Sequence, residues 1–149
     1  MANRFDDMAA AAKAGASYFA IVYLVAFVLG AARFLVVAPR VGETIAVLME
    51  TPIILTVSWI ASRWCAGRFA VRPDRLPRLL MGGIAFAFLI IGEIGVSVFM
   101  FGRSLDGTLV TFLSTPGIVG LSAQAAFALF PLVQAALRRS GKRSRFHGA

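Results

Sequence analysis

Charged side chains are scarce in this sequence. They make up 15% of its 149 residues, whereas hydrophobic residues make up 59% and the mean hydropathy is +0.82. Ordinary globular domains carry about 25% charged residues and are roughly 45–50% apolar. A soluble fold of this length could not bury so much apolar surface. The composition therefore excludes a soluble globular protein and indicates an all-α integral membrane protein with little mass outside the bilayer.

Cysteine and histidine are nearly absent, with one residue of each, Cys65 and His147. A single cysteine cannot form an intramolecular disulfide, and Cys65 is interpreted as a small packing residue. A single histidine excludes bis-histidine haem ligation and multi-histidine metal sites within one chain. The sequence also has no nucleophile–base pair, metal-ligand cluster or phosphate-binding loop. We therefore expect no cofactor, no metal site and no enzymatic activity.

Four apolar stretches are long enough to cross a membrane, for which a helix needs about 20 mainly apolar residues. They cover residues 17–38, 41–64, 79–101 and 116–137. Together they predict a four-transmembrane-helix bundle over residues 17–137. Residues 1–16 are polar and lack the form of a cleaved signal peptide. They are predicted to form a helix at the membrane surface or to extend the first span, which Pro39 is expected to end in a tight turn.

Basic residues gather in the loop after the second span and in the tail of residues 138–149. They are Arg63, Arg68, Arg72, Arg75 and Arg78 in the loop, and Arg138, Arg139, Lys142, Arg143 and Arg145 in the tail. Because positive charge is retained in the cytoplasm, this distribution predicts that both termini are cytoplasmic. Trp59 and Trp64 then fall near the inner interface, where tryptophan is favoured. Abundant arginine and alanine are typical of GC-rich bacterial genomes, so the predicted location is a bacterial inner membrane.

The basic residues also indicate the partners of the chain. Directly after a membrane span, a basic segment favours contact with anionic lipid headgroups over nucleic acid, which we do not expect as a partner. Headgroup contact is assigned to Arg68, Arg72, Arg75, Arg78, Arg138, Arg139, Lys142, Arg143 and Arg145. A homo-oligomer or a larger membrane complex is left open as a protein partner.

Four polar residues inside the predicted spans form the candidate site. A charge at the centre of a span costs roughly 2.5–3.5 kcal/mol, so such residues tend to face other helices and to have partners. At a rise of about 1.5 Å per residue, three of them lie roughly 12–13 Å from the outer ends of their spans and the fourth about 7 Å. The sequence therefore predicts an intramembrane polar layer in the outer half, with no comparable group in the inner half. Its members are Arg33, Glu50, Glu93 and Gln124.

Four neighbours are predicted to support this polar layer. Glu43 and Thr51 belong to a polar stripe on the same side of the second span as Glu50. Pro52 cannot donate to the carbonyl of Leu48, which leaves a kink and a free acceptor near Glu50. Ser97 follows Glu93 by one helical turn.

Two functions fit the polar layer. An Arg–Glu pair alone joins helices, which favours an accessory or assembly component of a larger membrane complex, and this is the leading interpretation. Two carboxylates near one arginine leave an excess negative charge or a retained proton, the usual condition for a cation or proton site. The alternative is therefore a small oligomeric transporter or channel, proton- or cation-coupled, that uses Glu50 and Glu93.

Overall fold

The computed structural model describes residues 4–100, 102 and 104–146, with residues 141–146 described by their backbone alone. The described residues are nearly all helical, and none of them forms a β-strand. Four helices are long and apolar enough to cross a membrane: Arg4–Val41, Glu43–Arg68, Arg75–Phe99 and Thr115–Ser140. This finding confirms the prediction of an all-α chain with four apolar spans.

The first span is longer than predicted and ends differently. Helix α1 (Arg4–Ala32) passes without a break into the π-helical turn η1 (Arg33–Val37) and the short helix α2 (Ala38–Val41). The polar N-terminal residues therefore extend the first helix, one of the two predicted alternatives. The expectation that Pro39 ends this span is wrong, because Pro39 lies in the first turn of α2, where a missing N–H is tolerated. The chain turns at Gly42, whose φ of +85° favours glycine.

The remaining elements are α3 (Glu43–Arg68), α4 (Arg75–Phe99), α5 (Leu105–Phe112) and α6 (Thr115–Phe146). Helix α5 lies in the connection between the third and fourth spans, outside the four predicted helices. The side chain of Ser104 caps it by accepting a hydrogen bond from the backbone N–H of Gly107. Helix α6 continues past the predicted end of the fourth span into the basic tail.

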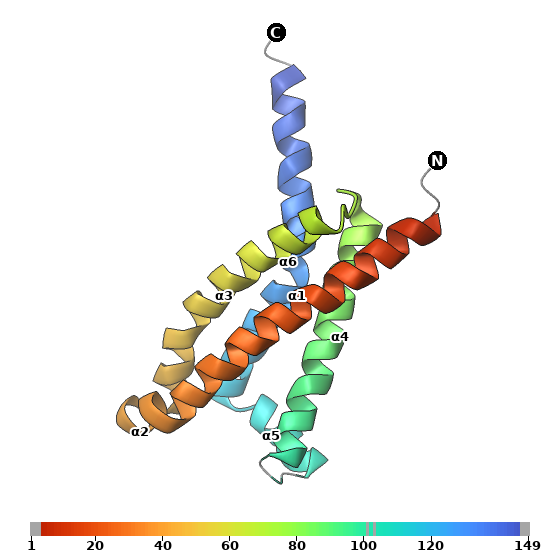
Figure 1. Cartoon of the computed structure of the whole chain (residues 1–149). Coiled ribbons are helices and arrows are strands. Elements are labelled where there is room, and N and C mark those ends of the chain that lie inside the picture. Colours follow the sequence, from red (N-terminus) through yellow and green to blue (C-terminus); the bar gives the residue numbers. More distant parts are fainter. Residues whose placement is uncertain (1–3, 101, 103, 147–149) are drawn as a thin grey trace.

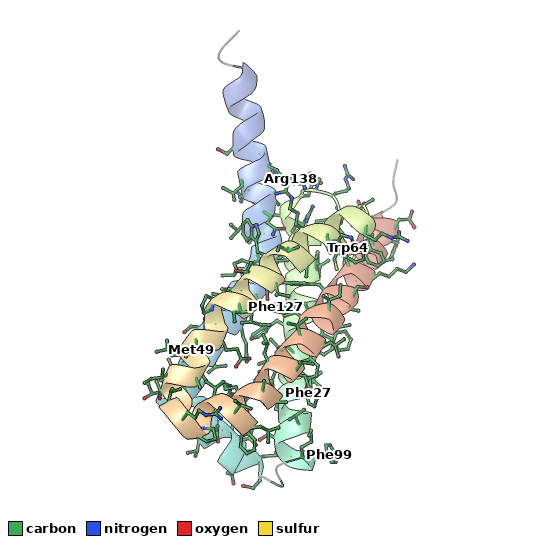
Figure 2. All side chains as sticks on the ribbon, turned by 60° about the vertical axis from the view of Figure 1, so that its left-hand side comes forward. Phe27, Met49, Trp64, Phe99, Phe127 and Arg138 are labelled. Atoms are coloured by element: carbon green, nitrogen blue, oxygen red, sulfur yellow. The ribbon has the colours of Figure 1, made fainter. Side chains whose placement is uncertain are left out.

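Each long helix packs against two others, α1 on α3 and α4, and α6 on α3 and α4. Both termini and the turn between α3 and α4 lie at one end of the molecule, and α2 and α5 lie at the other (Figure 1). We call these the basic end and the α5 end. Large apolar side chains such as Phe27, Met49 and Phe99 are exposed on the outside of the helices (Figure 2), an arrangement compatible with a lipid environment.

The best-packed part of the core lies in the half nearer the basic end. The ring of Tyr18 stacks on Phe127 with 4.3 Å between ring centroids, and its hydroxyl donates a hydrogen bond to the Phe127 carbonyl oxygen at 2.9 Å. Two glycines allow helix backbones to touch here. A Cβ on Gly15 of α1 would lie 2.6 Å from the Met81 carbonyl oxygen of α4, and one on Gly82 of α4 would overlap the Ala128 carbonyl of α6. Close contact through small residues is the usual way in which membrane helices pack.

Candidate functional site

A cavity of about 250 Å³ lies among α1, α3, α4 and α6 toward the α5 end. Side chains of α5 and of the residues after it, including Phe112 and Ser114, line the cavity as well. A volume of this size has room for several water molecules. All four members of the predicted polar layer contribute to its lining: Arg33, Glu50, Glu93 and Gln124.

Arg33 and Glu50 form an ion pair between the first and second spans. The Nε atom of Arg33, the first residue of η1, lies 2.8 Å from Oε2 of Glu50 on α3, in a contact that lacks the alignment of a hydrogen bond. The Glu50 side chain is 19% exposed, so the pair is largely screened from the surroundings. Glu43 is 65% exposed, and its Oε1 lies 3.9 Å from Nη1 of the same arginine. One guanidinium thus serves two carboxylates of α3.

Glu93 and Gln124 form a second contact, between the third and fourth spans. The Nε2 group of Gln124 on α6 donates a hydrogen bond to Oε1 of Glu93 on α4, at 2.6 Å. No basic side chain among the described residues lies within ion-pair distance of Glu93. The Oε1 atom of Gln124 is buried and has no hydrogen-bond partner among the residues that the structure describes. The structure therefore divides the polar layer into two pairs and leaves Glu93 beside a neutral amide.

The other predicted supporting residues do not lie together: one lines the cavity, one is exposed and one contacts α5. Thr51 lines the cavity, but its hydroxyl donates to the Val47 carbonyl of its own helix at 2.8 Å. Pro52 is exposed and lies inside a continuous α3. The Oγ atom of Ser97 is 2.8 Å from Oγ1 of the buried Thr108, so Ser97 holds α5 against α4 and takes no part in the cavity lining.

A second polar contact lies in the half nearer the basic end, where none was predicted. Gln134 of α6 is only 6% exposed. Its Oε1 accepts a hydrogen bond from the Ser62 hydroxyl at 3.2 Å, and its Nε2 donates to the Trp59 carbonyl oxygen at 2.8 Å. The prediction of no comparable group in this half of the helices is therefore wrong. A signal was available, because Gln134 lies inside the predicted fourth span, three residues before its end.

Arg78 does not have the exposed position that was predicted for it. Its side chain is 3% exposed, and Nε and Nη2 donate to the carbonyl oxygens of Arg72 and Val71 at 3.3 and 3.1 Å. The assignment of headgroup contact to Arg78 is wrong, because its guanidinium is used to hold the turn between α3 and α4.

The other arginines at the basic end differ in their pairing. Arg72 lies 3.2 Å from Asp7 and 3.5 Å from Asp74, and Arg139 lies 2.6 Å from Asp74. These ion pairs connect α1, the α3–α4 turn and α6. Arg68, Arg75 and Arg138 are exposed. The side chains of the tail residues Lys142, Arg143 and Arg145 lie outside the described part of the structure.

Comparison with known proteins returns no relative. No protein-family model, no curated protein and no solved structure matches the chain. Within the described residues, no three His, Cys, Asp or Glu side chains are grouped so that they could hold a metal ion.

Proposed function

We propose that the chain forms a four-helix transmembrane bundle in a bacterial inner membrane, with both termini in the cytoplasm. Two observations support this topology. The four long helices lead back and forth between the two ends, so that both termini lie at the same end (Figure 1). The arginine-rich α3–α4 turn lies at that same end, as the preference for cytoplasmic positive charge requires.

Reporter fusions test the topology. Fusions after Ala149 and within the turn at Asp74 should both report a cytoplasmic position, and a fusion at Asp106 in α5 should report an external one. A cytoplasmic signal at Asp106 would contradict the proposed arrangement.

We also propose that the cavity binds a proton or a small cation, and that the protein acts as a small proton- or cation-coupled transporter or channel. The position of Glu93 is the observation that carries this proposal. Its carboxyl group lines the cavity, and no basic partner for it exists among the described residues. An unpaired carboxylate inside a membrane is costly, so it either holds a proton or attracts a cation.

The charge balance of the lining supports the same reading. Glu43, Glu50 and Glu93 line the cavity together with one basic residue, Arg33. Arg33 is already in contact with the two acids of α3. The buried Oε1 of Gln124 adds an acceptor that has no donor among the described residues. Carboxylate and amide oxygens are the ligands that hard cations prefer.

The accessory or assembly role, which the sequence favours, is the second candidate here, and one feature supports it. Each polar pair joins two neighbouring helices, Arg33–Glu50 across the first and second spans and Glu93–Gln124 across the third and fourth. On this reading the pairs hold the helices together, and the protein serves a larger membrane complex without carrying a solute.

Substitution of Glu93 distinguishes the two functions. Glu93→Gln keeps the size of the side chain and an acceptor for the Gln124 amide, but it removes the group that titrates or binds a cation. In vesicles that contain the purified protein, this variant should lose pH or cation flux while its thermal stability stays close to that of the wild type. Asp106→Asn is the matched control, because it removes an exposed carboxylate of α5 outside the cavity lining. It should retain flux.

The opposite result would support the accessory role. If the wild type shows no flux, or if Glu93→Gln retains full flux and complements a deletion strain, the cavity is not a transport site. In that case the two polar pairs act only as contacts between helices.

A further inference from the structure

A groove of about 570 Å³ lies between α3 and α6 near the basic end, outside the cavity described above. Both tryptophans of the chain, Trp59 and Trp64, line it. Three arginines complete its polar part: Arg63 and Arg68 from α3, and Arg138 from α6. Trp64 and Arg138 both lie toward the end that carries the termini, far from Phe99 (Figure 2).

The three arginines of the groove carry positive charge that the described residues do not neutralise. Arg63, Arg68 and Arg138 are exposed, and no carboxylate in the described part of the chain lies within ion-pair distance of them. Arg72 and Arg139, at the same end, are instead paired with aspartates. The groove is therefore the place where uncompensated positive charge meets aromatic side chains.

The groove also changes from apolar to basic along α3. Trp59 and the exposed Ile60 are the groove residues of α3 farthest from its C-terminal end, and the ring of Trp59 packs edge-on against Phe130 of α6 at 5.2 Å between centroids. Arg63 and Arg68 follow toward the helix end, and the rise per residue places Ile60 about 12 Å from Arg68. Between the arginines, Gly67 leaves open space where a side chain would stand.

We propose that this groove binds one anionic phospholipid. The phosphate contacts Arg63, Arg68 and Arg138, and an acyl chain lies against Trp59 and Ile60. Three unpaired arginines complement a lipid phosphate, and basic pockets between membrane helices on the cytoplasmic side are known to take such headgroups. A soluble anion would use only the basic part of the groove, whereas a phospholipid matches both the basic and the apolar parts. The site is independent of the function proposed for the cavity.

Tryptophan fluorescence tests the proposal directly, because both tryptophans line the groove and bromine atoms on an acyl chain quench tryptophan on contact. The protein is reconstituted in zwitterionic vesicles that contain a small fraction of brominated phosphatidylglycerol or, in a parallel series, brominated phosphatidylcholine. We expect the anionic lipid to quench at a mole fraction lower by on the order of a hundredfold, since each of the three arginines near the headgroup contributes roughly a fivefold preference.

A matched pair of variants separates the groove from general surface charge. Arg138→Gln should reduce the preference for the anionic lipid by about fivefold. Arg4→Gln removes an exposed arginine of the same end that does not line the groove and has no assigned headgroup contact, and it should leave the preference unchanged. Inorganic phosphate should not relieve the quenching.

Three outcomes would overturn the proposal. Equal quenching by the two lipids in the wild type would show that the groove does not select charge. Quenching by neither lipid would show that another protein or a second copy of this chain covers the tryptophans. Equal effects of Arg138→Gln and Arg4→Gln would reduce the preference to unspecific surface charge.

Discussion

Two glutamines of α6, ten residues apart, lie in opposite halves of the molecule and differ in how their amide groups are used. Gln134, near the basic end, accepts a hydrogen bond from Ser62 and donates one to the Trp59 carbonyl oxygen. Gln124, near the α5 end, donates to Glu93, but its own carbonyl oxygen is buried without a partner among the described residues. Both polar atoms of the amide have a hydrogen-bond partner in one half, and only the nitrogen has one in the other.

The packing around the two glutamines differs in the same way. Near the basic end, helix backbones touch at Gly15 and Gly82, and Tyr18 fills the space between α1 and α6. Near the α5 end, the helices surround a cavity lined by three carboxyl groups. A polar side chain between these helices therefore stabilises packing where both of its polar atoms have hydrogen-bond partners. Where one polar atom has no partner and the side chain lines a cavity, it marks a candidate binding site.

The largest difference in stability is expected between two variants that each add a side chain to a glycine, one in each half of the molecule. Gly82→Val places methyl groups against the Ala128 carbonyl of α6 and should destabilise the protein by about 3 kcal/mol, or prevent folding. Gly120→Val should change stability far less, because Gly120 lines the cavity and nothing lies within 4 Å of its added Cβ. Unfolding in detergent micelles measures both. Equal losses of stability would contradict the difference in packing.

An intermediate effect is expected from replacing each glutamine by leucine. Gln134→Leu leaves the buried Ser62 hydroxyl and the Trp59 carbonyl without their partner, which should cost about 1–3 kcal/mol of unfolding free energy and leave cation flux unchanged. Gln124→Leu should instead alter flux, because Glu93 loses its amide neighbour. If both variants changed flux to the same degree, the two glutamines would not have separate roles.

The smallest effect is expected in a double-mutant cycle on the cavity. Arg33→Ala should lower stability because Glu50 loses its ion-pair partner, and adding Glu50→Gln should recover part of the loss. Interhelical polar couplings in membranes average about 0.6 kcal/mol and reach about 1.7 kcal/mol, so the recovered energy should fall in that range. The corresponding cycle with Glu93→Gln should be additive, since no contact joins Arg33 to Glu93 in the described structure. Coupling with Glu93 equal to that with Glu50 would mean that the two polar pairs are not separate.

The spans and the members of the candidate site followed from sequence, because both depend on local properties. A run of apolar residues is sufficient for a span, and helical rise alone places Glu50, Glu93 and Gln124 at similar depth. The pairing of Arg33 with Glu50 and of Glu93 with Gln124 could not be predicted from the sequence. Depth does not show which helices are neighbours or how each helix is rotated about its axis. Arg33 lies in a π-helical turn and contacts Glu50. Because Glu50 and Glu93 are predicted at similar depth, depth alone could not tell which of them is the partner of Arg33.

Tertiary contacts explain the other differences. In the sequence, Arg78 is one of several basic residues near the end of a predicted span. Only the path of the α3–α4 turn brings two carbonyl groups within hydrogen-bond distance of its guanidinium. Pro39 reads as a helix stop, but the chain reaches Gly42 before it turns. Gln134 lies inside the predicted fourth span, and only the packing of α3 on α6 brings Ser62 and the Trp59 carbonyl within hydrogen-bond distance of it.

Access of water to the cavity tests the central claim most directly. Ala123 of α6 lines the cavity, and Ile91 of α4 is 65% exposed on the outer surface of the helices. Each lies eight residues, or about 12 Å, from the α5 end of its helix. The single native cysteine, Cys65, is 0% exposed, so the wild-type chain serves as the unreactive control. A membrane-impermeant thiol reagent applied on the α5 side should label Ala123→Cys and leave Ile91→Cys in lipid unlabelled. Absence of labelling at Ala123→Cys, or equal labelling of both variants, would contradict a water-filled site around Glu93.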